Sequence, residues 1–270
     1  MNKKKFLIAI DLDGTLLNKK SKVSLSNKLF LRKLERQGHI IVLASGRPSR
    51  AVKYFRDYIG LHTPIICYNG AYCFHPERDD FKPTIYNFPL DVVKTVYNDL
   101  KGIFTNFMCE TDDDIWLVKE DLKLNKFFWH EDMDIIYGDM NETLHENPWT
   151  MIIQIKDNTY NDAIKEAIHK HENYSVRFWT SSPYAEVYHK DTSKAQCIFS
   201  VAEYYNIPKE NCIAIGDANN DIEMITECGF GIAMINGNEN VKKIADLVSK
   251  KDNNHSGVKY AIKEAFKILY

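Results

Sequence analysis

The sequence lacks the features of a membrane-bound, secreted or nucleic-acid-binding protein. None of its apolar runs approaches the roughly 20 residues that a helix needs to span a bilayer. The basic start is followed by an apolar stretch, residues 6–10, that is too short for a signal peptide. A net charge of −2 gives no attraction toward nucleic acid or anionic lipid. We therefore expect a cytoplasmic protein with neither a nucleic-acid nor a membrane partner.

Motifs for zinc and dithiol chemistry are also missing. The six cysteines form no CxxC pair, and the nine histidines show no HExxH spacing. Several of these cysteines lie in apolar segments, which is typical of reduced, buried thiols. We expect structural thiols in a reducing compartment. The cysteines are Cys67, Cys73, Cys109, Cys197, Cys212 and Cys228.

What is present is an ordinary globular composition, 44% apolar and 27% charged, with strands and helices alternating in the first and last thirds. Short apolar runs bounded by turn signals predict buried parallel strands at residues 6–10, 40–44, 65–67, 212–215 and 231–234. Helices are expected after Ser24 or Ser26 and over residues 52–59, 194–205, 221–227 and 258–269. This alternation predicts a doubly wound α/β domain with a mostly parallel sheet.

The middle of the chain differs, because it is rich in aromatic residues and in alternating segments. Residues 115–118 and 151–155 read as strands, residues 161–172 as a helix, and residues 174–180 with 185–189 as a hairpin around Ser181, Ser182 and Pro183. The sequence therefore predicts an α+β cap domain over residues 84–190, inserted into an α/β core domain formed by residues 1–83 and 191–270.

Two carboxylates end the first predicted strand. Asp11 and Asp13 follow the apolar run directly, and a glycine and a threonine come next. Ligands bind beyond the carboxyl ends of strands in open α/β sheets. Two acids so close repel one another, so we expect a cation between them. Aspartate with a hard cation suits phosphoryl transfer through an aspartyl-phosphate. The alternative is a solvated acidic turn, since Asp and Gly are common after strands.

Three weaker signals accompany this pair. Ser45 and Gly46 end the second predicted strand with a hydroxyl and a backbone that an anion can approach closely. Lys194 lies at the start of a predicted helix, and Asp217 and Asp221 follow another buried strand. Taken singly, these are ordinary turns, caps and a solvated lysine.

Together and in this order, the four signals resemble the haloacid dehalogenase superfamily, and more narrowly its Cof-type phosphatases with a class IIB cap. The matching strings are DLDGTLL, ASGRP and IGDANNDIEMI, and the C-terminal region around residues 241–245 and 256–258 is similar too. Ser45 stands where that group usually has threonine, and Ala195 where glycine is common. Neither difference removes a charged group or a hydroxyl.

The resemblance implies a role for each motif residue. Asp11 would be the nucleophile, and Asp13 would protonate the leaving oxygen and then deprotonate water. Mg²⁺ would be bound by Asp11, the backbone carbonyl of Asp13 and Asp217, while Asp221 would hold a metal-bound water or orient Lys194. The groups expected to bind the phosphoryl oxygens are the amides of Leu12 and Gly46 and the side chains of Ser45, Lys194 and Asn220.

Specificity is expected to come from outside this set. Arg47 and Asn69 would contact the leaving group, and Trp179, Tyr184 and His189 would do so from the cap. The structural alternatives are a surface ion pair for Arg47, a turn residue for Asn69, and aromatic residues of the cap's own core for the other three. The function expected is a Mg²⁺-dependent phosphatase of small phosphorylated metabolites, sugar phosphates first. A phosphomutase and a non-catalytic phosphometabolite-binding protein are the alternatives, and the substrate, pathway and oligomeric state stay open.

Overall fold

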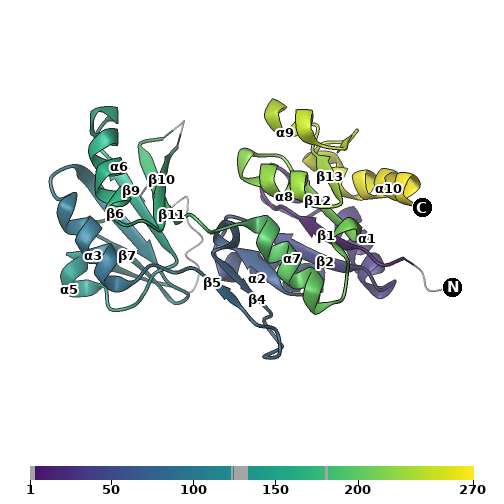
Figure 1. The fold of residues 1–270 in the computed structure, drawn as a ribbon, viewed down its shortest axis with the longest axis horizontal. Coiled ribbons are helices and arrows are strands. Elements are labelled where there is room, and N and C mark those ends of the chain that lie inside the picture. Colours follow the sequence, from purple (N-terminus) through teal and green to yellow (C-terminus); the bar gives the residue numbers. More distant parts are fainter. Residues whose placement is uncertain (1–3, 123, 125–132, 180–181) are drawn as a thin grey trace. The chain divides into compact units, whose positions relative to one another are not determined.

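A computed structural model describes residues 4–122, 124, 133–179 and 182–270, and the chain divides into two units (Figure 1). The first unit is formed by Met1–Thr84 and Ser193–Tyr270, and the second by Ile85–Thr192. The second unit is therefore an insertion in the sequence of the first. Each unit has its own sheet and its own core, and each is described by itself below.

The first unit is built on one sheet whose strands follow the order β14-β13-β12-β1-β2-β3-β4-β5. Its neighbours from β14 to β3 pair in parallel, whereas β4 runs antiparallel to β3. The predicted mostly parallel α/β sheet is confirmed. The strands are β1 (Leu7–Ile10), β2 (Ile40–Ala44), β3 (Ile65–Cys67), β4 (Tyr72–Phe74), β5 (Thr84–Ile85), β12 (Cys212–Gly216), β13 (Phe230–Ala233) and β14 (Leu247–Val248).

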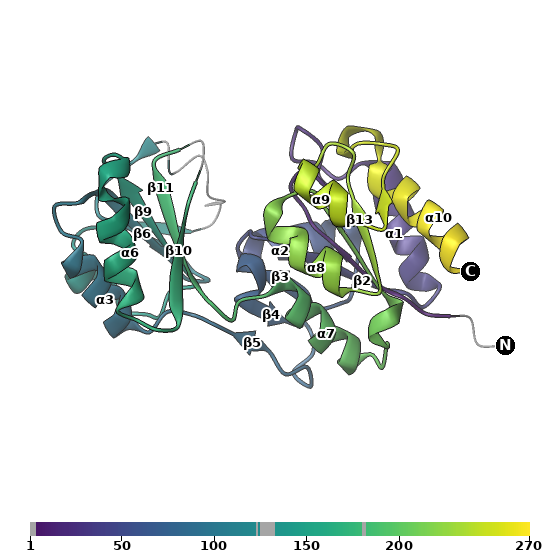
Figure 2. The same ribbon diagram turned by 45° about the horizontal axis from the view of Figure 1, so that its top comes forward.

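Helices cover both faces of this sheet, as a doubly wound fold requires (Figures 1 and 2). Helix α1 packs on α2 and α10, and helix α7 packs on α8, which in turn contacts α9. Short 3₁₀ turns lie at Tyr68–Gly70, Lys209–Asn211, Asn219–Asp221 and Asn253–His255. The helices are α1 (Leu25–Arg36), α2 (Ser49–Ile59), α7 (Lys194–Tyr204), α8 (Ile222–Glu227), α9 (Glu239–Ile244) and α10 (Gly257–Leu269).

The helix boundaries follow from local chemistry. The Ser24 hydroxyl accepts a hydrogen bond from the backbone N–H of Asn27, and so caps α1. Gly60 ends α2 in the left-handed region at φ +82°, a conformation that glycine adopts without strain. Among the described residues, no helix combines the length and the apolar character needed to cross a bilayer.

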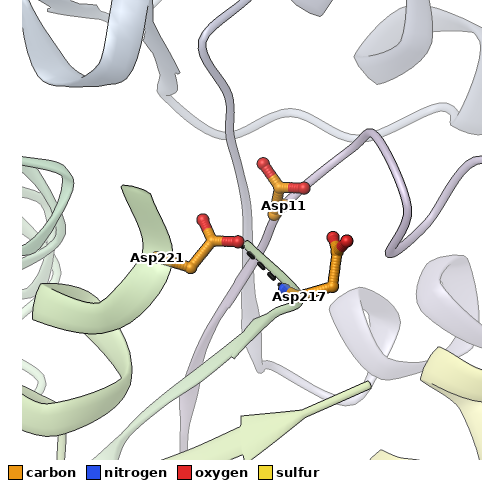
Figure 3. Close-up of side chains that lie close together, drawn as sticks. All are labelled: Asp11, Asp217 and Asp221. Atoms are coloured by element: carbon orange, nitrogen blue, oxygen red, sulfur yellow. Dashed lines mark hydrogen bonds between the residues drawn. The ribbon is translucent and has the colours of Figure 1, made fainter. Parts of the chain in front are cut away.

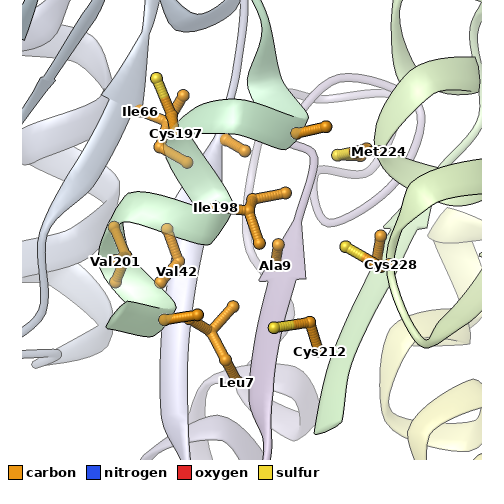
Figure 4. Close-up of a cluster of buried hydrophobic side chains, with 14 of the residues drawn as sticks. Leu7, Ala9, Val42, Ile66, Cys197, Ile198, Val201, Cys212, Met224 and Cys228 are labelled. Atoms are coloured by element: carbon orange, nitrogen blue, oxygen red, sulfur yellow. The ribbon is translucent and has the colours of Figure 1, made fainter. Parts of the chain in front are cut away.

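One hydrophobic core of the first unit lies between the sheet and α7 with α8 (Figure 4). Alternate strand residues such as Leu7, Ala9 and Val42 meet Ile198 and Val201 of α7 there. All six cysteines are free and buried, which confirms the expectation of structural thiols.

The second unit is a six-stranded sheet in the order β10-β11-β9-β6-β7-β8, antiparallel except for β7 with β8. Its helices α3 and α6 cover one face (Figure 1). The elements are α3 (Leu90–Asp99), β6 (Phe104–Glu110), β7 (Asp114–Leu117), β8 (Asp134–Tyr137), α5 (Met140–Thr143), β9 (Thr150–Ile155), a 3₁₀ turn (Asn158–Tyr160), α6 (Asn161–His169), β10 (Tyr174–Phe178) and β11 (Tyr184–His189).

The hairpin predicted in this unit is present, since β10 and β11 pair antiparallel with Val176 opposite Val187. Thr180, expected to end its first strand, and Ser181, expected at its turn, fall outside the described residues. Helix α6 ends at His169, three residues before the predicted end. The elements that were not predicted are α3, α5, α9, β4, β5, β6, β8 and β14.

The packing of α7 gives a stability prediction. Ile198 is fully buried in the core of the first unit, so Ile198→Ala removes transfer free energy and leaves a cavity. We expect a loss of about 2–5 kcal/mol in the free energy of unfolding, measured by urea denaturation. The control is Leu29→Ala, at a residue that is 57% exposed, for which a change within about 0.5 kcal/mol is expected. Equal losses in both variants would contradict this view of the core.

Candidate active site

The polar residues of the predicted motifs gather at one edge of the first unit's sheet. Asp11 follows β1, Ser45 follows β2 and Asp217 follows β12. Because β1 pairs in parallel with both β2 and β12, the carboxyl ends of all three strands lie at the same edge. Backbone bonding continues beyond the strand, where the N–H of Asp11 donates to the carbonyl of Ile215 at 2.9 Å.

Three carboxylates meet at this edge (Figure 3). Asp11, Asp217 and Asp221 each offer an oxygen, and these oxygens lie within 4.8 Å of one another. The carboxylate of Asp221 accepts hydrogen bonds from the backbone N–H groups of Asp217 at 2.9 Å and Ala218 at 3.1 Å. This arrangement needs glycine before Asp217, because a Cβ at Gly216 would lie 2.5 Å from the Asp221 side chain.

One ammonium group bridges two of these carboxylates. The Nζ atom of Lys194 lies 2.9 Å from Oδ1 of Asp11 and 2.7 Å from Oδ1 of Asp221. Lys194 is only 2% exposed and begins α7, whose first turn is capped by Ser193. Burial opposes the charged form of this amine, but attraction to Asp11 and Asp221 raises its pKa overall. Lys194 therefore stays protonated.

The carboxylates themselves are shifted toward their neutral forms. Burial, together with repulsion from Asp221, raises the pKa of Asp11 well above its usual value. Burial also raises the pKa of Asp217 to about 6, although a hydrogen bond from Thr15 opposes that shift. One ammonium does not balance three carboxylates, so the cluster has a deficit of positive charge.

The donor set of the cluster fits a hard divalent cation. Mg²⁺ prefers oxygen ligands and is usually held by one or two carboxylates together with waters. Asp11 and Asp217 offer such oxygens, and Asp221 is already engaged by Lys194 and two backbone N–H groups. Asp11 and Asp217 would hold the ion, which would offset the charge deficit.

No role was predicted for Thr15 or Gly14, but Thr15 holds Asp217 in place and Gly14 makes room for it. The Thr15 hydroxyl donates to Oδ1 of Asp217 at 2.7 Å. Gly14 adopts φ +78°, and a Cβ there would lie 2.2 Å from Oδ2 of Asp217. Both residues stand directly after Asp13, so their place beside the paired acids was the signal available.

The loop after β13 also contacts the site and was missed. The side-chain amide of Asn236 donates to the carbonyl of Gly14 at 2.8 Å. The backbone N–H of Asn238 donates to the carbonyl of Asp217 at 2.8 Å. This loop therefore ties the segment after β1 to the segment after β12. Its sequence reads as an ordinary turn and carried no signal of this role.

Asp13 lies apart from the three-carboxylate cluster. Its side chain is 57% exposed and forms a two-pronged ion pair with Arg47, at 2.7 Å from Nε and 2.8 Å from Nη2. The hydrogen bond to Asp13 is the main cause that raises the pKa of Arg47. Arg47 was predicted to contact the leaving group, and Asp13 was predicted to protonate the leaving oxygen. The structure thus pairs these two residues with each other.

The remaining predicted residues of the first unit line neighbouring loops. The buried Ser45 hydroxyl accepts from the backbone N–H of Arg47 at 3.2 Å. The Asn220 side chain donates to Oδ1 of Asn69 at 2.8 Å, which links the loops after β12 and β3. A Cβ at Gly46 would lie 3.0 Å from the Asn69 amide, so these loops pack closely. Leu12, between the two predicted catalytic acids, has a fully buried side chain.

The three aromatic candidates lie in the second unit. Tyr184 is 2% exposed and belongs to a buried cluster on its sheet. The ring of Trp179 packs edge-on against Tyr184 at 5.5 Å, and its Nε1 donates to Glu186 at 3.4 Å. The ring of His189 stacks on Tyr86 at 4.7 Å. Trp179 and His189 are half-buried, whereas Tyr184 is buried and could act only through its neighbours.

Comparisons with known proteins agree on one group. A family model described as haloacid dehalogenase-like hydrolase matches residues 8–262. The chain is 30% identical to 5-amino-6-(5-phospho-D-ribitylamino)uracil phosphatase YitU of Bacillus subtilis, over 99% of this chain and 100% of the relative. It is 29% identical to another B. subtilis phosphatase of that name, YcsE, over 95% of this chain and 94% of the relative.

Solved structures show the same fold. A haloacid dehalogenase-like hydrolase from Bacteroides thetaiotaomicron superposes with a TM-score of 0.82 at 26% identity, covering 99% of this chain and 100% of that one. The subclass IIB sugar phosphatase BT4131 superposes with a TM-score of 0.77 at 23% identity, covering 98% and 99%. The second likeness concerns the fold alone.

The charge deficit of the cluster gives a prediction about cation binding. In cation-free buffer at pH 7.5, Asp217→Asn is expected to raise the melting temperature, because the folded state of the wild type must ionise a carboxyl whose pKa is raised to about 6. Added Mg²⁺ is expected to raise the melting temperature of the wild type by mass action but not that of the variant. Differential scanning calorimetry measures both effects.

The same experiment has a pH dependence and a control. Below pH 6 the gain from Mg²⁺ in the wild type is expected to shrink, because a proton then competes for Asp217. Asp79→Asn, at an exposed position, is expected to keep the full gain. If Mg²⁺ raised the melting temperature of Asp217→Asn as much as that of the wild type, the cation would bind elsewhere.

Proposed function

The chain belongs to the haloacid dehalogenase-like hydrolases and is a phosphatase of that family, and from this premise we propose that it hydrolyses small phosphorylated metabolites with Mg²⁺ as cofactor. The observation that carries the proposal is the buried set of Asp11, Asp217 and Asp221 around Lys194. Sugar phosphates are the first substrate class. We further propose that the reaction takes place in the cytoplasm.

We propose Asp11 as the nucleophile. Its Oδ1 is held by Lys194, so Oδ2 is the oxygen that attacks phosphorus. A bond forms between Asp11 and phosphorus, the ester bond from phosphorus to the leaving oxygen breaks, and that oxygen takes a proton from Asp13. Water then attacks phosphorus, gives a proton to Asp13, and frees Asp11 and inorganic phosphate.

Ionisation of Asp11 is a requirement of this scheme. Burial raises its pKa, and the neighbouring ammonium of Lys194 acts in the opposite direction. Mg²⁺, when bound by Asp11, Asp217 and the backbone carbonyl of Asp13, supplies positive charge that favours the ionised form and offsets the charge on the phosphoryl oxygens. Asp221 acts indirectly, by orienting Lys194 or holding a water of the ion.

The phosphoryl group itself would be bound by first-unit loops. The proposed donors are the Ser45 hydroxyl, the Gly46 amide and the Asn220 side chain, with the Leu12 amide and Lys194 completing the set. Such fixed donors stabilise the charge that spreads over the phosphoryl oxygens in a loose transition state. Arg47 and Asn69 would contact the leaving group, and Arg47 would then exchange its ion pair with Asp13 for that contact.

We propose that the second unit serves as a cap that sets specificity. Groups that touch only phosphate and cation cannot distinguish one ester from another, so discrimination needs contacts with the leaving group. Trp179 and His189 offer partly accessible rings for such contacts, and Tyr184 supports Trp179. Two relatives are named for a phosphoribityl substrate, a phosphorylated polyol, which supports sugar phosphates as the first class to test.

The nucleophile is tested by Asp11→Asn, which keeps the size of the side chain and removes the attacking charge. We expect loss of nearly all release of phosphate from p-nitrophenyl phosphate, with an unchanged circular dichroism spectrum. Asp162→Asn, whose carboxyl is 94% exposed, is expected to stay within about twofold of the wild type. If the activity of Asp11→Asn stayed within tenfold of that of the wild type, Asp11 would not be the nucleophile. If an isomer formed in place of free phosphate, the protein would be a phosphomutase.

Specificity is tested by Trp179→Ala, Tyr184→Ala and His189→Ala on a panel of sugar, polyol and nucleotide phosphates. Each variant is expected to change the ranking of kcat/KM across the panel more than it changes turnover of p-nitrophenyl phosphate. Tyr137→Ala, at a residue of the same unit that is 44% exposed, is the control and is expected to leave the ranking unchanged. An equal loss of kcat/KM on every substrate would show that these side chains have a structural role and do not set specificity.

A further inference from the structure

The first unit carries a concave site that the phosphatase chemistry does not use. A hollow of about 480 Å³ lies where α1 and α2 end and where β2 and the loop before β3 begin. Its polar lining comes mainly from Arg32, Arg36, His39, His62, Arg78 and Tyr205.

This hollow is separate from the candidate active site. Ile40, the first residue of β2, lines it, whereas Ser45 follows the last residue of that strand. A strand rises about 3.3 Å per residue, so the five residues of β2 separate the two sites by roughly 15 Å. A ligand in one site therefore does not touch the groups of the other.

Positive charge is in excess around the hollow. Arg32 and Arg36 form no ion pair with any residue that the structure describes. The one carboxylate in the lining, Glu35, already accepts from the backbone N–H and the ring of His62. Arg78 is paired with Asp80. Within the described part of the chain, the two guanidinium groups of α1 therefore remain without a carboxylate partner.

The helix dipole does not account for both of these arginines. The carbonyl end of α1 is offset by the basic residues of its last turn, Lys33 and Arg36. Arg32 lies one turn before Arg36, and like charges four residues apart on a helix repel each other. The folded protein thus holds two guanidinium groups on one face where an anion would relieve their repulsion.

We propose that this hollow is a binding site for the phosphate group of a small molecule, distinct from the substrate. The planar fork of arginine matches the oxygens of a phosphate in two-pronged hydrogen bonds. The Tyr205 hydroxyl is a further donor, since burial raises its pKa to about 12 and keeps it protonated. A volume of about 480 Å³ lies in the range of small-molecule sites. The bound phosphate is either inorganic phosphate or part of an organic ester.

The test is a titration of the ¹⁵N-labelled full chain, followed by amide NMR signals. The probes are inorganic phosphate and 2-hydroxyethylphosphonate, whose carbon–phosphorus bond resists hydrolysis. The signals of Gly38, Gly60 and His62 are expected to shift along one binding curve, and those of Gly46 along a second curve. Tighter binding of the phosphonate at the hollow assigns it to an organic ester, and tighter binding of phosphate assigns it to the free ion.

Two variants make the outcome specific. The double variant Arg32→Ala with Arg36→Ala is expected to raise the dissociation constant from the Gly38, Gly60 and His62 signals at least tenfold. The dissociation constant from the Gly46 signal and the turnover of p-nitrophenyl phosphate are expected to stay unchanged. Lys20→Ala with Lys33→Ala removes the same charge from exposed positions of the same unit and is expected to leave both curves intact. The proposal is overturned if Gly38, Gly60 and His62 do not shift, or if both double variants weaken the first curve equally. Loss of the Gly46 curve alone would count against the proposed function instead.

Discussion

The bridge that Lys194 forms between Asp11 and Asp221 is the interaction on which the rest of the site depends. It places one almost fully buried ammonium among three carboxylates. Breaking such a buried pair from one side is costly, since it leaves a charge without a partner. One ammonium still leaves the three carboxylates short of positive charge, and burial raises the pKa of Asp217 to about 6. A hard cation held by Asp11 and Asp217 would offset that imbalance, and in the proposed mechanism Lys194 would face the phosphoryl oxygens.

The fold brings these groups together through the parallel sheet rather than through nearby sequence. Lys194 and Asp11 are 183 positions apart, and Thr15 and Asp217 are 202 positions apart. The loops that carry them fit only because glycine occupies positions 14 and 216, where a Cβ would collide with a carboxylate. The contacts of Asn236 and Asn238 then lock two of these loops to each other. The proposed phosphate chemistry would thus be confined to one edge of one sheet.

Much of the first unit could be predicted, because buried parallel strands are short, continuous apolar runs. Such runs predicted β1, β2, β3, β12 and β13, and those of β1, β2 and β12 are followed by the polar residues that the structure places at one edge. The second unit was harder, because its strands mix polar and apolar residues. Strand β6 reads FTNFMCE, in which the buried Asn106 and Glu110 hide the apolar pattern. The contacts of Arg47 with Asp13 and of Asn236 with Gly14 depend on loop geometry, which residue pattern does not encode.

The proposed mechanism depends on a covalent bond between Asp11 and phosphorus, and the most direct measurement is to trap that covalent state. The enzyme is mixed with excess substrate and Mg²⁺, quenched in acid, and treated with borohydride, which reduces an aspartyl-phosphate to homoserine. Peptide mass spectrometry then locates the change. The account predicts conversion of Asp11 alone, and none when substrate is omitted. Steady release of phosphate with Asp11 unmodified, or with the change at another carboxylate, would contradict it.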